Sequence, residues 1–121
     1  MTIDEAIAAA DRLVPNPLAR TDKLRWLSEL DGWLAAVLRP YGVLPAAFDG
    51  YDDNTDGETS LLLRLPDDDV YRHYLELQIY SALYETTRAN AAAARYNAAL
   101  QDALDHVTRT HLPIKTAVRY Y

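Results

Sequence analysis

The stretch DDDVYRHYLELQIYSALYETTRAN (Asp67–Asn90) decides how the chain folds. Its three opening acids suit the positive end of a helix that begins there. The apolar residues that follow occupy a wider arc of this helix than one neighbouring helix usually covers. Because an unbroken helix through this half would be unusually long, we predict a turn between Leu83 and Asn90. The two apolar faces are Val70, Tyr74, Leu77 and Tyr84 on one side, and Tyr71, Leu75, Ile79 and Leu83 on the other.

Two further helices are predicted on the N-terminal side. TIDE (2–5) is a capping box, in which Thr2 accepts from the amide of Glu5 and Glu5 accepts from the amide of Thr2. The first helix then runs until Pro15, and a second is expected from Thr21–Asp22 to just before Pro40. Their apolar stripes are Ile3, Ile7, Ala10 and either Leu13 or Val14, then Leu27, Leu30, Leu34 and Val37, widened by Trp26, Trp33 and Leu38.

These patterns predict an all-α protein, a single domain over residues 1–121 built as a four-helix protomer. Proline and glycine in residues 40–66 predict a long irregular arm between the second and third helices, with SLLLRL (60–65) as a possible short strand. Residues 111–121 form a basic tail that contains no acid. The inward positions predicted for the fourth helix are Ala92, Tyr96, Ala99, Leu100, Ala103, Leu104 and Val107.

Composition limits the classes of function. The 121 residues carry a net charge of −6, which argues against a protein whose main task is to grip nucleic acid. There is no cysteine, so disulfides and thiolate metal sites are excluded. No apolar run approaches a membrane span, and the acidic N-terminus lacks the basic flank of a signal peptide. We therefore expect a protein made and kept in a cytoplasm, without a membrane partner.

No pattern in the sequence indicates an active site, a metal or a cofactor. DDNTDGETS (52–60) fits the first half of a calcium-binding loop, but Leu63 stands where that loop needs a bidentate glutamate. His73 and Glu76 could face one metal from a helix, yet no second pair of this kind answers them. The serines lack the glycine context of a nucleophile. We expect a protein that is not an enzyme and that uses no cofactor.

Tyrosine is the residue type that stands out, with nine copies against one phenylalanine. A tyrosine buries its ring while its hydroxyl stays polar, and it is enriched at protein interfaces. Several tyrosines lie on the predicted third helix. We interpret the second apolar face of that helix as a surface for other subunits.

Two blocks of the sequence resemble a family of tailed-phage head–tail connector (adaptor or head-completion) proteins. DDDVYRHYLELQIY (67–80) is similar to the family's run of acids, tyrosine and YLE-x-QI, and Thr108–Pro113 fits the usual ending. The glycine-containing turn of the family is LYETTRAN (83–90) here. EAIAAADRLVPNPLARTDKLRWLSELDGWL (5–34) resembles the family's opening in Glu5, Ala6, Ile7, Asp11, Pro15, Asn16, Lys23 and Trp26 through Gly32.

The resemblance implies an all-helical structural protein of a phage or prophage virion. Such a protein assembles in the host cytoplasm into a ring homo-oligomer, sits between the portal and the tail, and docks the next tail or stopper protein. DNA passes through the ring without specific binding, which an acidic body suits. The resemblance implies no catalysis and supplies no catalytic residue.

A ring needs two unlike surfaces on each protomer, and we expect the arm and the third helix to supply them. The tail would meet the portal or the next ring. On this hypothesis a chain without residues 50–63 stays folded but monomeric. The alternative is a monomeric helical regulator that binds a partner through the tyrosine-rich face of the third helix. The candidate interface residues are Leu61, Leu62 and Leu63 in the arm, Tyr71, Tyr80 and Tyr84 in the third helix, and Lys115, Arg119, Tyr120 and Tyr121 in the tail.

Overall fold

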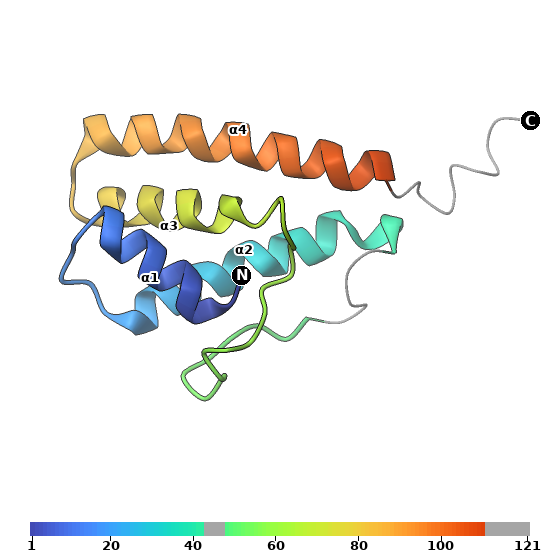
Figure 1. Cartoon of the computed structure of the whole chain (residues 1–121). Helices are drawn as coiled ribbons and strands as arrows, with labels where there is room; N and C mark the ends of the chain where they lie inside the picture. Colours follow the sequence, from blue (N-terminus) through green and yellow to red (C-terminus); the bar gives the residue numbers. More distant parts are fainter. Residues whose placement is uncertain (43–47, 111–121) are drawn as a thin grey trace, which may run out of the picture.

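The structure is a computed structural model that describes residues 1–42 and 48–110. These residues form α1 (Ile3–Leu13), α2 (Arg20–Val37), the short 3-10 helix η1 (Arg39–Tyr41), α3 (Asp69–Ala82) and α4 (Thr86–Thr110). Figure 1 shows α3 and α4 as an antiparallel hairpin, with α1 and α2 on the side of α3 away from α4. The all-α fold is confirmed. The strand considered at 60–65 does not form, and Ser60 makes only an isolated bridge with Thr2.

Helix α3 lies at the centre of the fold, which explains its two apolar faces. It contacts α1, α2 and α4 (Figure 1). The side chains of Tyr71, Leu75 and Ile79 are each 0% exposed. The expectation that this face is free for other subunits is therefore wrong at Tyr71, because helices of the same protomer cover it, while Tyr84 beyond the end of α3 is exposed.

The helix starts follow local signals only in part. The Thr2 hydroxyl accepts from the Glu5 amide at 3.1 Å and the Glu5 carboxylate accepts from the Thr2 amide at 2.9 Å, which confirms the capping box. Helix α2 begins at Arg20 instead of Thr21–Asp22, and its N-cap Ala19 makes no side-chain hydrogen bond. A side-chain cap is thus not what sets the start of this helix.

The core follows the predicted stripes with one departure at Val37, and of the two alternatives on the first helix the buried one is Val14. On α2 the predicted leucines are buried, but Val37 is 38% exposed and Leu38 is buried in its place. On α1 Leu13 is 50% exposed and Val14 is buried. Leu38 and Val14 are both C-cap residues, where the backbone leaves helical geometry and turns the side chain back to the core. The inward face of α4 is confirmed, with Ala92, Ala103 and Val107 buried and Tyr96, Ala99, Leu100 and Leu104 partly buried.

The predicted turn between α3 and α4 is confirmed at residues 83–85. The Glu85 amide donates to the Tyr80 carbonyl at 3.0 Å, and the Tyr84 amide donates to the Ser81 carbonyl at 3.2 Å. This pair of bonds defines a Schellman C-cap. Tyr84 occupies the left-handed position of that cap with φ 59°, a place that glycine usually takes.

The described part of the arm is attached to the N-terminal end of α1. The Ile3 amide donates to the Thr59 carbonyl at 3.0 Å, and the Leu61 amide donates to the Met1 carbonyl at 2.9 Å. Leu61 and Leu63 are each 3% exposed and belong to the core. Deletion of residues 50–63 would therefore remove part of the core, which contradicts the expectation of a folded monomer.

Candidate interaction surface

A fully buried carboxylate joins α2, the arm and α3. Asp31 is 0% exposed. It accepts hydrogen bonds from the Tyr51 hydroxyl at 2.5 Å, the Tyr71 hydroxyl at 2.6 Å and the Leu62 amide at 3.2 Å. The Tyr71 hydroxyl in turn accepts from the Leu63 amide at 2.8 Å. We call these five residues the Asp31 joint.

The Asp31 joint holds its carboxylate with neutral donors. Burial raises the pKa of Asp31, and the hydrogen bonds from Tyr51 and Tyr71 oppose that rise. Burial, together with the neighbouring carboxylate, also raises the pKa of both tyrosine hydroxyls, so that they remain donors. Because Asp31 is enclosed and its acceptor sites are used, its part is to hold the arm in place rather than to meet a ligand.

A second polar joint, in which Lys23 is buried and Asp11 is partly exposed, closes the turn between α1 and α2. The Lys23 ammonium lies 2.8 Å from the Asp11 carboxylate, donates to the Leu18 carbonyl at 3.1 Å, and belongs to a side chain only 4% exposed. The Asn16 amide group donates to Asp11 at 3.0 Å and to the Val14 carbonyl at 2.8 Å. A buried ammonium is tolerated where its charge and its donors are matched in this way. The Lys23 joint, these five residues, fixes the path from α1 into α2.

Sequence reasoning missed the role of Asp31, although a signal was present. Asp31 follows Leu27 by four residues and precedes Leu34 by three, which places it on the buried stripe of α2. An acid on an apolar stripe indicates a buried polar contact. Its partner Tyr51 lies in an irregular segment, where no periodicity predicts what it touches.

Arg72 contacts both members of the His73–Glu76 pair, the side chains that could face one metal from a helix. It lies 3.0 Å from the Glu76 carboxylate and 3.1 Å from that of Asp69, all on α3. Burial lowers the pKa of His73, which favours the neutral ring. Within the described residues there is no group of three or more His, Cys, Asp or Glu that could hold a metal ion. The cluster stabilises α3 through pairs three and four residues apart.

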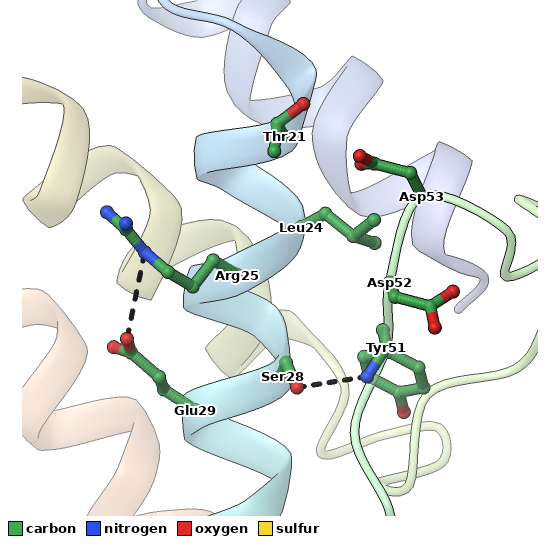
Figure 2. Close-up of a pocket in the computed structure, with 8 residues that line it drawn as sticks. All are labelled: Thr21, Leu24, Arg25, Ser28, Glu29, Tyr51, Asp52 and Asp53. Atoms are coloured by element: carbon green, nitrogen blue, oxygen red, sulfur yellow. Dashed lines mark hydrogen bonds and ion pairs between the residues drawn. The ribbon is translucent and has the colours of Figure 1, made fainter.

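A groove of about 290 Å³ lies between α2 and the arm. Figure 2 shows Leu24 pointing from α2 toward the arm, and Ser28 accepting from the Tyr51 amide at 2.9 Å. Arg25 points away from the arm, and its guanidinium lies 3.8 Å from Glu29 (Figure 2). Asp52 and Asp53 make the arm side of the groove acidic. The lining residues are Thr21, Leu24, Arg25, Ser28 and Glu29 of α2 and Tyr51, Asp52 and Asp53 of the arm.

Local turns account for part of the acidity of this loop. The Asp52 carboxylate accepts from the Asn54 amide at 2.9 Å, and the Asp56 carboxylate accepts from the Glu58 amide at 3.0 Å. Asparagine and aspartate commonly make such bonds in turns. The Asp53 side chain is exposed and has no hydrogen bond or ion pair with any residue in the described ranges. Asp53 is thus a carboxylate available to a partner.

The closed end of the α3–α4 hairpin carries a second exposed feature. Tyr84 is 90% exposed. The Arg88 side chain is 69% exposed and its guanidinium lies 3.8 Å from the Glu85 carboxylate. Residues 80–88, which we call the hairpin end, present an aromatic ring and a cation together. A cavity of about 310 Å³ adjoins them, lined by Leu13, Val14 and Pro15 of α1 and by Tyr80, Leu83, Glu85 and Arg88.

The structure separates the candidate interface residues into three groups. Leu61, Leu63 and Tyr71 are buried in the protomer, so they stabilise it and are not a free surface. Leu62 and Tyr80 are partly buried, and only Tyr84 is highly exposed. The tail candidates lie outside the described residues: Lys115, Arg119, Tyr120 and Tyr121.

No family model, curated protein or solved structure matches the chain. In the part of the chain that the structure describes, no helix combines the length and the apolar character needed to cross a membrane. The fold and its surfaces define a small all-α protein whose arm is fastened to its helices by the buried Asp31 joint.

Proposed function

We propose that this chain is a non-enzymatic structural protein of a tailed phage or prophage, a head–tail connector. In this proposal it forms a ring between portal and tail, extends the DNA channel and docks tail components. The observation that carries the proposal is an overlap. Asp11, Asn16, Lys23 and Asp31, which belong to the resemblance with the connector family, supply the side-chain charges and the amide of the two joints, and Lys23 and Asp31 are buried in them.

This overlap matters because of what buried polar residues do. A buried polar group is tolerated only where its partners are in place, so each joint specifies one backbone arrangement. The Lys23 joint specifies the turn between α1 and α2, and the Asp31 joint specifies the course of the arm. A resemblance in such residues therefore concerns the path of the backbone as well as the helix content. It supports a connector-like fold better than a similar content of helix would.

The charge of the chain also supports the proposal. A net charge of −6 repels phosphate, which suits a channel through which DNA slides without specific binding. The proposed partners are copies of the same chain, the portal and the next tail or stopper protein. Assembly would take place in the host cytoplasm and end at the head–tail junction of the virion. The basic, acid-free tail with Lys115 and Arg119 would meet an acidic surface of the portal or the next ring.

The alternative of a monomeric regulator has less support. It requires a tyrosine-rich face on α3 that one partner could cover. Tyr71 is 0% exposed and Tyr74 and Tyr80 are partly buried, so among these tyrosines Tyr84 alone is largely exposed. A single exposed ring is a small basis for a dedicated binding face.

Negative-stain imaging and native mass spectrometry of the full chain test the proposal, alone and mixed with the portal ring of the phage that encodes it. The expected result is a closed ring of many copies on the portal, with a lengthened channel. A matched variant, Lys115→Glu with Arg119→Glu, should weaken docking to the partner ring and leave the core fold unchanged. Binding as a single copy, or failure to bind portals at all, would refute the connector function.

A further inference from the structure

Tyr84 combines an unfavourable backbone conformation with a solvent-exposed aromatic ring. Its φ of 59° is in the left-handed region that residues other than glycine and asparagine seldom adopt. Its side chain is 90% exposed, so burial within the protomer does not offset that cost. Glycine would serve this helix cap better. The ring is therefore placed where only a partner outside the protomer could bury it.

The α2–arm groove has the dimensions of a side-chain site. Its volume of about 290 Å³ is at the lower limit of the range of about 300–1,000 Å³ that is typical of small-molecule pockets. The Tyr51 ring and the edge of Leu24, which is only 4% exposed, form the apolar part of a lining that also holds Arg25 and Glu29. Tyr51 is held in advance, since its hydroxyl bonds to Asp31 and its amide bonds to Ser28. A preformed wall loses little freedom when another group binds against it.

Charge matches the hairpin end to this groove. Arg88 lies four residues after Tyr84 and its side chain is largely exposed. Asp52 and Asp53 line the arm side of the groove, and neither forms an ion pair with a residue of the described ranges. Glu85 lies 3.8 Å from Arg88, and Arg25 lines the α2 side of the groove, so the charge match is between Arg88 and the two carboxylates of the arm. Opposite charges at a contact raise the association rate and favour the correct partner.

One protomer cannot bring these two surfaces together. Figure 1 shows the α3–α4 turn at one end of the hairpin, while the arm projects on the side of α3 away from α4. A contact between them must therefore join two copies of the chain. Because the two surfaces differ, each copy offers one and receives the other, which is the arrangement that generates rings.

We propose that the hairpin end of one copy docks in the α2–arm groove of the next copy. In this contact the Tyr84 ring packs against the Tyr51 ring, and Arg88 faces Asp52 and Asp53. The inference rests on the proposed function and deepens it by naming both surfaces of the ring contact.

Cross-linking between introduced cysteines tests the contact, and the chain has no cysteine of its own to interfere. Single variants Tyr84→Cys and Asp53→Cys are mixed and treated with a short bismaleimide, which each thiol joins by addition. The expected result is a covalent dimer that forms in the mixture far more than in either variant alone. Leu65→Cys replaces Asp53→Cys as the matched control, because Leu65 is 85% exposed and outside both surfaces. A mixture no better than this control would overturn the proposal, and so would efficient dimers from Tyr84→Cys alone, which indicate a two-fold contact.

A second set of variants does not depend on cross-linking. Tyr84→Gly suits the left-handed backbone, so it should fold at least as well as the natural chain and weaken self-association by about tenfold or more. Tyr84→Phe keeps the ring and should associate normally. Arg88→Glu should weaken association, and Asp53→Arg in the partner should restore it. Sedimentation over a concentration series measures all four, and unchanged association of Tyr84→Gly would refute the contact.

The outcomes separate this contact from the proposed function. If the natural chain assembles on portals but the Tyr84–Asp53 link does not form, the contact is wrong and the connector function stands. If the natural chain does not self-associate on portals and does not self-associate alone at millimolar concentration, the contact and the connector function are both wrong.

Discussion

Replacement of Asp31 by alanine should destabilise the protein by about 2–4 kcal/mol, because a buried donor left without its acceptor costs about 1–3 kcal/mol and three donors are affected to different degrees. The change leaves three donors without their acceptor: the Tyr51 hydroxyl, the Tyr71 hydroxyl and the Leu62 amide. Tyr71 is 0% exposed, so its hydroxyl cannot turn to water. Tyr51 and Leu62 are partly exposed and recover some hydration.

The size of this effect follows from two opposing contributions. Each hydrogen bond to a charged acceptor stabilises the fold by about 1.5–3 kcal/mol. Removal of the carboxylate also removes the cost of its burial, which is several kcal/mol. The net loss is therefore smaller than three separate bonds would suggest. Asp31→Asn keeps one carbonyl acceptor for Tyr51 and Leu62 and carries no charge, so it should cost only about 1–2 kcal/mol.

Urea unfolding followed by far-ultraviolet circular dichroism measures these differences from the midpoint and the slope of each curve. Tyr51→Phe is the matched control, since it removes one donor and leaves the carboxylate and the ring in place. It should cost less than Asp31→Ala. If Asp31→Ala remains within about 0.5 kcal/mol of the natural chain, as surface substitutions do, the joint does not hold the fold and the reasoning fails.

Further measurements test other parts of the fold. Because burial raises the folded pKa of Asp31 above its usual 3.8, its contribution to stability is fully present below that value and is lost as pH rises through the folded pKa. Urea melts at several pH values should show the natural chain losing stability relative to Asp31→Asn as the pH rises, and a constant difference would contradict this. Leu30→Ala should cost about 2–5 kcal/mol because Leu30 is 3% exposed, and a change within the noise of the melt would show that the site is not core. Gly50→Ala should cost about 1–3 kcal/mol, since Gly50 has φ 90° and an added Cβ would lie 2.7 Å from the Ser28 hydroxyl oxygen; an unchanged melting curve would show that the arm yields there. Calorimetry should show no micromolar calcium binding by residues 52–60, and binding that Asp52→Ala abolishes would reverse that conclusion.

The sequence predicted those features of the fold that depend on near neighbours. The capping box at Thr2 and Glu5 needs only residues three apart, and it forms as expected. The buried stripe of α2 follows from the helical repeat. The turn after Leu83 follows from the length that a helix can reach in a small domain. In each case the energy that decides the structure is carried by residues close together in the chain.

The tertiary structure alone decided which surfaces are covered. The wide apolar arc of α3 predicted a partner, but periodicity cannot tell a helix of the same chain from a second subunit. The partners of Asp31 lie 20, 31 and 40 residues away, and one of the hydroxyls comes from the irregular arm. The arm is therefore part of the core through contacts that no local pattern records. Exposure of Tyr84 likewise depends on where the α3–α4 turn lies relative to α1, because burial is a property of packing between distant segments.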